Sequence, residues 1–431
     1  MSETLAIQGG TPVRTKSFPS WPVFDHEEEA ALIRVLRSGK WWQFAYGEGV
    51  ELSEKPQGED RAEVSRFQEE FASAHDCRFG IAATNGTATL ELILRAMGIG
   101  PGDEVIVPPY TFIASASSIL QVGAVPVFVD VSIDTFNIDP ARIEEAITPR
   151  TRGIMPVHFG GQSADMDAVN VIARKRGLRV VEDAAHAHGA EWRGKKCGSL
   201  GEAGSFSFQA SKNMTAGEGG IITTNDEALA QLARSYLWAG REPGRPWYEH
   251  HRLGGNYRLS EFQGAVLRVQ LRRLREQTDR RDANGRYLAE RLRRDLSGVM
   301  PMRLDDRATR IAFHLFMFRC DLREFGGMTR ADFIAALGAE GIPCSGGYVH
   351  PLYRNPMFLR KDFFKGGFPC VAPFAREIDY AAFAERCPAS EAACREAVWF
   401  TQNCLLATRA DMDDIVAAIA KIQRSKAGPG A

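Results

Sequence analysis

The sequence has almost no net charge and no recognisable targeting segment. Its 53 lysines and arginines are balanced by 54 aspartates and glutamates, which gives a formal net charge of −1. A balance of this kind gives no indication of a nucleic-acid partner or an anionic membrane partner. No apolar run reaches the ~18 residues that a membrane-spanning helix needs, and no basic and apolar signal-peptide pattern opens the chain. We therefore expect a cytoplasmic protein.

Metal-binding patterns are also missing. The eight cysteines are scattered, none lies in a Cys-x-x-Cys pair, and no histidines cluster at the spacing of metal ligands. Scattered single cysteines are typical of a reduced compartment, where most of them pack in the core. The sequence therefore predicts no metal site.

The length and the pattern of apolar residues predict an α/β fold. A chain of 431 residues with 44% hydrophobic residues can build a large core and two domains. From about residue 80 to 224, strand-like and helix-like segments alternate, which indicates a mainly parallel sheet covered by helices. Ligands of such sheets bind at the carboxyl ends of the strands. The strand-like runs are 104–107, 125–129, 153–157, 179–181, 205–208 and 220–223.

The rest of the chain suggests a smaller second domain. A long helix beginning near Leu259 leads away from the alternating region, and a strand at 313–318, a helix near 330–340 and a terminal helix after Asp411 follow it. We predict an N-terminal arm over 1–24, a large domain over 25–265, a small α+β domain over 266–425 and a flexible tail over 426–431. A loop from Phe44 to Arg61 is unusually long.

Lys212 is the first candidate for chemistry. It follows the strand-like run 205–208 within a segment of small residues, GSFSFQASKNMTAGEGG over 204–220. A lysine in such a place can form an imine with a carbonyl, and pyridoxal phosphate is the commonest partner of that kind. Any single lysine is far more often a solvated surface residue, so the other parts of such a site must also be found.

Three further patterns stand where strands should end. Residues 84–89, Thr-Asn-Gly-Thr-Ala-Thr, precede an amphipathic helix and form either a phosphate cradle or an ordinary helix cap. Asp183 ends a buried run and could hold the proton on a pyridine nitrogen, and His186 next to it could pack beside the ring or only orient Asp183. Phe112 follows 104–107 and could stack on the ring or fill the core. Ser207 could donate to a phosphate.

Taken together, these motifs resemble the DegT/StrS-type aminotransferases of sugar and aminocyclitol biosynthesis. The resemblance runs from about residue 25 to 420 and implies the fold-type-I architecture of pyridoxal-phosphate enzymes. The motifs that carry it are Asn85-Gly86-Thr87-Ala88, residues 100–105, 108–112, 165–168 and 182–189, the segment 205–220, and Gly255-Asn256-Tyr257-Arg258-Leu259.

The resemblance implies a role for each matching residue. Lys212 forms the imine with pyridoxal 5′-phosphate and moves the proton as general base and acid. Asp183 pairs with the pyridine nitrogen, Phe112 stacks on the ring, and His186 lies near the phenolic oxygen. The phosphate is held by Gly86, Thr87, Ser207 and, from the partner subunit of a homodimer, Asn256.

The family resemblance also narrows the reaction. Related sugar dehydratases have histidine in place of this lysine, so Lys212 favours transamination by a ping-pong mechanism. The opening residues 5–14, the segment Gln209-Ala210-Ser211-Lys212 and the stretches 386–388 and 398–399 are more similar to the glutamine-using branch, which includes scyllo-inosose aminotransferases and 3-amino-5-hydroxybenzoate synthase. We expect glutamine or glutamate as donor and a keto-cyclitol or keto-sugar as acceptor in antibiotic biosynthesis.

Two alternatives remain open from the sequence. One is an aminotransferase for a nucleotide-linked keto-hexose, and the other is a non-enzymatic regulator that retains the fold. The intact Lys212 and Asp183 argue against the regulator. Candidates for the acceptor pocket, each of which could equally be structural, are Trp41, Trp42, His158, Tyr348, His350 and Tyr353.

Overall fold

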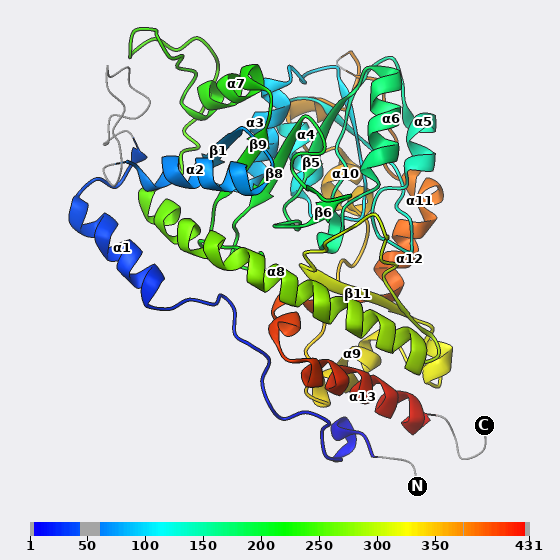
Figure 1. Cartoon of the computed structure of the whole chain (residues 1–431). Coiled ribbons are helices and arrows are strands. Elements are labelled where there is room, and N and C mark those ends of the chain that lie inside the picture. Colours follow the sequence, from blue (N-terminus) through cyan, green and yellow to red (C-terminus); the bar gives the residue numbers. More distant parts are fainter. Residues whose placement is uncertain (1–3, 44–60, 374, 427–431) are drawn as a thin grey trace.

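A seven-stranded sheet forms the centre of the computed structural model, which describes residues 4–43, 61–373 and 375–426. The strand order is β1-β9-β8-β5-β4-β2-β3. Figure 1 labels β1, β9, β8 and β5 of this sheet. The pairs from β3 to β8 are parallel, whereas β9 runs antiparallel to both of its neighbours. The strands are β1 (Phe79–Ala83), β2 (Glu104–Val107), β3 (Val125–Phe128), β4 (Thr151–Ile154), β5 (Arg179–Asp183), β8 (Ala203–Ser207) and β9 (Gly220–Thr224).

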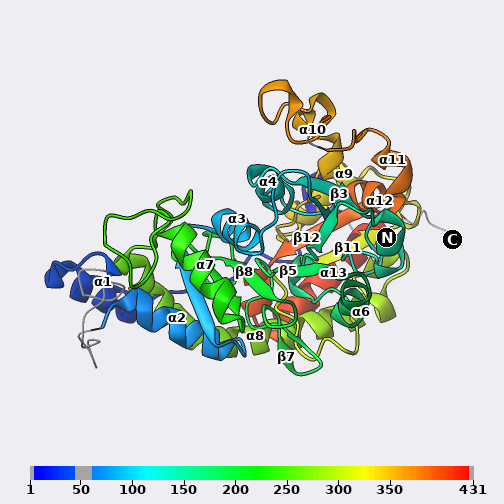
Figure 2. The same cartoon turned by 90° about the horizontal axis from the view of Figure 1, so that it is seen from above.

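Helices cover both faces of this sheet. In the view from above, α3 and α4 lie on one side of β5 and β8, and α6 and α8 lie on the other (Figure 2). Both faces are therefore shielded from water, which explains why β2 and β3 are buried at every position. The main helices are α1 (His26–Ser38), α2 (Glu63–Ala74), α3 (Gly86–Ala96), α4 (Ala114–Gln121), α6 (Met166–Arg176), α7 (Glu227–Leu237) and α8 (Glu261–Asp295).

The predicted α/β class is confirmed, with differences in detail. The run 220–223 does form a strand, but β9 is antiparallel. The predicted strand at 153–157 lies earlier, at β4, and β1 was not predicted. Its sequence, Phe-Gly-Ile-Ala-Ala, has a single β-branched residue and no alternation. It is held in the sheet by its pairing with β9.

A second, three-stranded antiparallel sheet lies in the C-terminal part of the chain. It consists of β10 (Val299–Pro301), β11 (Leu315–Cys320) and β12 (Ala397–Thr401), with β11 in the middle. β11 begins two residues later than the predicted strand at 313–318. The helix predicted near 330–340 is α9 (Arg330–Ala339), and the terminal helix is α13 (Arg409–Lys426). Shorter elements are α5 (Ile143–Ala146), β6 (Glu191–Trp192), β7 (Lys195–Lys196), α10 (Pro356–Arg360), α11 (Phe383–Arg386) and α12 (Pro388–Glu396).

Helix α8 runs along both parts of the molecule (Figure 1). It begins at a capping box, in which Ser260 and Gln263 bond each other's backbone N–H groups. It has 35 residues and contacts α1 and α2 near its start and α13 further along. The predicted division at residue 265 falls inside this helix, and the division into domains stays a prediction. The loop expected over 44–61 and the tail expected over 426–431 lie almost entirely outside the described residues.

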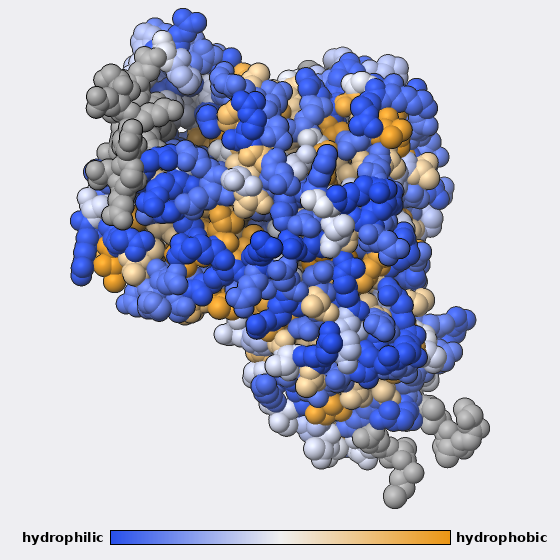
Figure 3. All heavy atoms as spheres, in the orientation of Figure 1, coloured by the Kyte–Doolittle hydropathy of each residue, from blue (hydrophilic) through white to orange (hydrophobic). Residues whose placement is uncertain are grey.

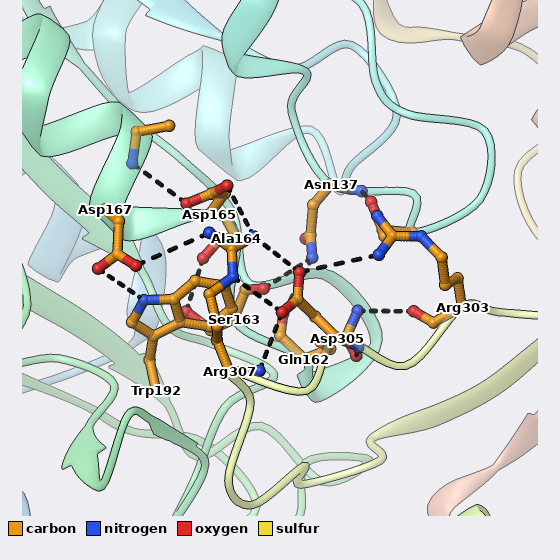
Figure 4. A network of polar contacts seen from close by, with 12 residues as sticks. Asn137, Gln162, Ser163, Ala164, Asp165, Asp167, Trp192, Arg303, Asp305 and Arg307 are labelled. Atoms are coloured by element: carbon orange, nitrogen blue, oxygen red, sulfur yellow. Dashed lines mark hydrogen bonds and ion pairs between the residues drawn. The ribbon is translucent and has the colours of Figure 1, made fainter.

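A polar network joins the loop before α6 to residues 303–307 (Figure 4). Asp165 caps α6 by accepting from the Ala168 N–H, and Arg307 Nη2 bonds both Asp165 and Asp305 at 2.8 Å. Gln162 donates to the Arg303 carbonyl at 3.1 Å and accepts from the Asp305 N–H. These contacts fix the start of α6 against the chain that leads to β11.

The N-terminal arm is bound to the C-terminal part of the molecule. The amides of Ala6 and Val13 donate to the buried carboxylate of Glu340, which also pairs with Lys421 of α13 at 2.9 Å. Arg14 pairs with Asp411 at 2.6 Å and with Asp414 at 2.7 Å. The arm contains a short 3-10 helix, Ala6–Gln8, and its first half is closely packed.

Among the residues that the structure describes, no helix is both long enough and apolar enough to cross a membrane.

The buried pair of Arg14 and Asp411 gives a testable contribution to stability. Burial alone would raise the pKa of Asp411, but hydrogen bonds from Thr408 and Arg14 outweigh burial and hold the pKa below its usual range. The stabilisation is therefore complete above about pH 4 and is lost as the pH falls through the folded-state pKa. We expect Asp411→Asn to lower the free energy of unfolding by about 2 kcal/mol at pH 7, measured by denaturant titration.

Asp414→Asn is the matched control because Asp414 bonds the same arginine but its side chain is 40% exposed. We expect this change to cost less than about 1 kcal/mol. Equal losses of unfolding free energy in the two variants would contradict this role of Asp411. So would a loss for Asp411→Asn that stays the same when the denaturant titration is repeated at a pH below the folded-state pKa of Asp411.

Candidate active site

Lys212 lies on a turn directly after β8, and hydrogen bonds across the base of the turn close it. The Phe208 N–H donates to the Gly219 carbonyl at 2.8 Å, and the Phe208 carbonyl accepts from the Thr215 hydroxyl at 2.9 Å. The Lys212 N–H donates to the Gln209 carbonyl at 2.9 Å. The segment of small residues is therefore a compact platform that presents Lys212 at the carboxyl end of β8.

The surroundings of Lys212 favour its neutral amine. Burial lowers its pKa from 10.5 to about 8, and the charge of Asp183 opposes this change. Three buried histidines, His186, His188 and His314, share this region, and burial holds the pKa of each well below its usual value, with the charge of Lys212 adding to the effect. A neutral amine at accessible pH is what an imine-forming lysine requires.

Asp183 is the last residue of β5 and is almost fully buried, with 5% of its surface exposed. Its Oδ2 accepts from the Ser115 hydroxyl at 2.6 Å, and its Oδ1 accepts from the Ala185 N–H at 3.2 Å. β5 pairs with β8 in parallel, and Asp183 is in register with Ser205. The strand pairing thus brings the carboxylate to the same sheet edge as the platform of Lys212.

Gly86, Thr87 and Ser207 come together at the start of α3. The Asn85 side chain caps the helix by accepting from the Ala88 N–H at 2.8 Å. The N–H groups of Gly86 and Thr87 then remain as donors in the first turn, next to the positive end of the helix dipole. A Cβ on Gly86 would lie 2.8 Å from the Ser207 Cβ, so only glycine lets the helix approach β8 this closely.

His186 and Phe112 are the two predicted ring neighbours of the cofactor. His186 Nδ1 accepts from the Gly160 N–H at 3.3 Å, so in the neutral ring its Nε2 carries the hydrogen. Its ring lies 4.1 Å from that of His314. Phe112 follows β2 and is 57% exposed, so it is not a core residue. Its exposure suits a ring that stacks on a ligand.

Asn256 is exposed, and its backbone pairs with that of Trp238. Its neighbours Tyr257 and Arg258 run beside the end of β1, where the Thr84 N–H donates to the Tyr257 carbonyl at 2.8 Å. Several large apolar side chains are exposed around α1 and the segment 241–253, namely Leu36, Trp41, Trp42, Trp247, Tyr248 and Leu253. Figure 3 shows apolar side chains along α1 and the adjoining part of α8.

The six candidates for an acceptor pocket divide into three groups. His158 and Tyr353 are fully buried: His158 Nε2 bonds Glu182 at 2.8 Å, and the Tyr353 hydroxyl donates to Glu391. Their positions argue for structural roles. Trp41 and Trp42 are about half exposed on the outer surface. Tyr348 and His350 are half-buried, and the Tyr348 ring packs at right angles against Trp399.

Sequence reasoning missed four polar residues around the site. Thr111 and Ser115 stand behind Asp183, and their i, i+4 spacing next to Phe112 was a signal that could have found them. Asn213 and His314 bond each other at 3.1 Å, and Asn213 donates to the Ala312 carbonyl. No local pattern marks His314, because its partner is 101 residues away.

The residues present fit pyridoxal phosphate. The N-terminus of α3 offers free backbone N–H groups, and at Gly86 there is no room for a Cβ beside Ser207. This arrangement suits a phosphate group. Asp183 suits a protonated pyridine nitrogen, and a half-buried lysine whose pKa is about 8 suits an aldehyde carbon.

Comparison with known proteins agrees with this geometry. The model of the DegT/DnrJ/EryC1/StrS aminotransferase family matches residues 51–420. The chain is 39% identical over 430 residues to a putative L-glutamine:3-amino-2,3-dideoxy-scyllo-inosose aminotransferase of Streptoalloteichus tenebrarius, which covers 99% of both chains. It is also 39% identical to the 3-amino-5-hydroxybenzoate synthase of Amycolatopsis mediterranei, over 91% of this chain and 94% of that protein.

A crystal structure of 3-amino-5-hydroxybenzoic acid synthase superposes with a TM-score of 0.82 and 38% identity, over 95% of this chain and 99% of that one. A structure of DesV from S. venezuelae in complex with a ketimine intermediate gives a TM-score of 0.74 at 33% identity, over 91% and 93% of the two chains. The resemblance seen in the motifs is thereby confirmed. The chain belongs to the DegT/DnrJ/EryC1/StrS aminotransferase family and is a pyridoxal-phosphate-dependent aminotransferase.

Proposed function

We propose that this aminotransferase moves the amino group of glutamine to a ketone on a free cyclitol. The proposal is carried by full-length similarity at 36–39% identity to enzymes whose names specify L-glutamine and a scyllo-inosose. The second relative, the 3-amino-5-hydroxybenzoate synthase, is also named for a six-membered carbocycle that carries an amino group. A six-membered carbocycle is therefore the class of acceptor that we favour.

The residues of the site have distinct tasks in this proposal. Gly86, Thr87 and Ser207 bind the phosphate, Asp183 holds the proton on the pyridine nitrogen, and Phe112 covers the ring. When it is bound, pyridoxal phosphate supplies an electron sink and carries the amino group between the two half-reactions.

Lys212 would hold the cofactor at its aldehyde carbon and would become a free amine when an incoming amino donor takes its place. Because its pKa is about 8, roughly one amine in ten is neutral at pH 7, several hundred times more than for a lysine with the usual pKa of 10.5. It could therefore take the proton from the donor Cα as general base and deliver it, as general acid, to the former aldehyde carbon on the other side of the nitrogen. His186, whose Nε2 carries the hydrogen, can donate to the phenolic oxygen of the cofactor.

A nucleotide-linked keto-hexose is the second candidate acceptor. It is favoured by the structural neighbour DesI, which was solved with its TDP-sugar product and is 27% identical over 98% of this chain. The identity to the cyclitol enzymes is higher, so we place the nucleotide-linked acceptor second.

We further propose a cytoplasmic homodimer in which each active site receives Asn256 from the partner subunit. Support comes from the large apolar side chains that are exposed around α1 and 241–253, since exposed side chains of this kind are common at protein–protein interfaces. The cytoplasmic location is supported by the eight free cysteines.

The first prediction concerns the ionisation of Lys212. We expect the rate at which the apoenzyme takes up pyridoxal phosphate to rise with pH and to level off above about pH 8, because only the neutral amine attacks the aldehyde. The charge of Asp183 raises this pKa, so Asp183→Asn should shift the midpoint to lower pH. Asp167→Asn, a carboxylate that bonds Arg193 and Trp192, is the control and should leave the midpoint unchanged. A midpoint near 10 in the wild type would refute the buried environment of Lys212.

The second prediction concerns the substrates. In single half-reactions followed by the visible absorption of the bound cofactor, glutamine should change the spectrum and a free keto-cyclitol such as 2-deoxy-scyllo-inosose should restore it. Lys212→Ala should respond to neither compound within the same time. Restoration only by a nucleotide-linked keto-hexose would favour the second candidate, and no response to any amino donor would contradict an aminotransferase.

The third prediction concerns the shared site. Lys212→Ala and Asn256→Ala are each expected to impair activity when assayed alone. After subunit exchange in an equimolar mixture, half of the dimers combine both variants, and one of their two sites is then fully wild type. The mixture should recover about one quarter of wild-type activity. No recovery, despite exchange shown by native mass spectrometry, would place Asn256 in the same subunit's site.

A further inference from the structure

A short chain of hydroxyl groups stands behind Asp183. The Ser115 hydroxyl donates to Asp183 Oδ2 at 2.6 Å, and the Thr111 Oγ1 lies 3.0 Å from the Ser115 Oγ. All three residues are buried, with exposed fractions of 5% for Asp183, 0% for Ser115 and 3% for Thr111. The contacts are therefore shielded from competing water.

The number of hydrogens on each group fixes the direction of donation among the hydroxyls. A carboxylate can only accept, so the single hydrogen of Ser115 must point to Asp183. The Ser115 oxygen is then free to accept, and the only hydrogen available for the second contact is that of Thr111. The order of donation is thus from Thr111 to Ser115 to Asp183, and both hydroxyl hydrogens are committed.

These hydroxyls are not ordinary helix caps. Serine and threonine near the start of a helix usually bond free backbone N–H groups. Helix α4 begins at Ala114, and no side chain caps it. The Ser115 N–H donates instead to the Phe112 carbonyl at 3.2 Å. The turn that presents Phe112 therefore also directs the Ser115 hydroxyl at Asp183 and the Thr111 hydroxyl at Ser115.

We propose that Thr111 and Ser115 are positioning residues that keep the Asp183 carboxylate ionised and aligned, so that the proton of the ion pair stays on the pyridine nitrogen. The inference rests on the proposed role of Asp183. Burial alone favours the neutral carboxyl, and hydrogen bonds to the charged form oppose it. With the Ala185 N–H on Oδ1 and Ser115 on Oδ2, each oxygen has one fixed donor. The plane of the carboxylate is thereby set before any ligand binds.

The consequence of losing Ser115 follows from the same balance. Without this hydroxyl, a buried carboxylate keeps one donor, and it becomes more favourable for it to take the proton from the ring nitrogen. The cofactor is a weaker electron sink when that nitrogen is unprotonated. Loss of Thr111 should act in the same direction but less strongly, because Ser115 can still donate to Asp183.

The test measures whether the pyridine nitrogen of the bound cofactor is protonated. Enzyme loaded with pyridoxal phosphate that carries ¹⁵N in the ring is studied by ¹⁵N NMR, since the shift of this nucleus reports protonation. We expect a protonated signal in the wild type and a move toward the unprotonated value in Ser115→Ala, together with a fall in kcat of about tenfold. Ser115→Thr should restore the wild-type shift.

Ser118→Ala is the matched control. Ser118 lies on the same helix and is equally buried, and its hydroxyl donates to the Ser115 carbonyl at 3.3 Å rather than to Asp183. This variant should leave the ¹⁵N shift unchanged. If Ser115→Ala does not retain the cofactor, Thr111→Val carries the test, with a smaller move in the same direction expected.

The variant Asp183→Asn distinguishes a failure of the role proposed for Asp183 from a failure of the role proposed for the two hydroxyls. If Asp183→Asn leaves the ¹⁵N shift at its wild-type value, the role of Asp183 itself is wrong. If Asp183→Asn moves the shift while Ser115→Ala and Thr111→Val do not, the role of Asp183 stands and the positioning role of the hydroxyls is overturned.

Discussion

The removal of one amine from water is the constraint on which the active site depends. A lysine in solvent is protonated and cannot attack an aldehyde. Burial lowers the pKa of Lys212 to about 8, and the neighbouring charge of Asp183 limits how far it falls. The three histidines around it have their pKa values lowered as well, so they add no positive charge to the region. The packing around Lys212 limits the access of water to its amine and leaves the carboxylate of Asp183 near it.

The sheet topology explains how distant segments reach this point. Parallel pairing of β5 with β8 places Asp183 and the turn after β8 at one edge, and the close approach of Gly86 to Ser207 adds the start of α3. The antiparallel return of β9 closes the turn that carries Lys212, because Phe208 and Gly219 bond each other across its base. An antiparallel strand in a mainly parallel sheet thus has a local purpose here.

The sequence was sufficient to predict the fold class. Short local patterns next to strand ends also marked Lys212, Asp183, Gly86 and Ser207 as candidates, and the structure brings these residues to one end of the sheet, while their roles stay predictions. What could not be predicted depends on distant contacts. β1 is a strand only because β9 pairs with it, and His314 enters the region only because the chain before β11 folds back onto Asn213. The hydroxyl of Ser115 carried a readable spacing, but its meaning depended on where Asp183 would lie.

The hydrogen bonds and the ion pair of Glu340 join the N-terminal arm to helix α13. The buried carboxylate accepts from the amides of Ala6 and Val13 and pairs with Lys421, while Lys421 also donates to the Thr11 carbonyl, 410 positions away. These contacts need Glu340, the N-terminal arm and α13 at the same time. A chain shortened before α13 would therefore leave a buried carboxylate without its charged partner.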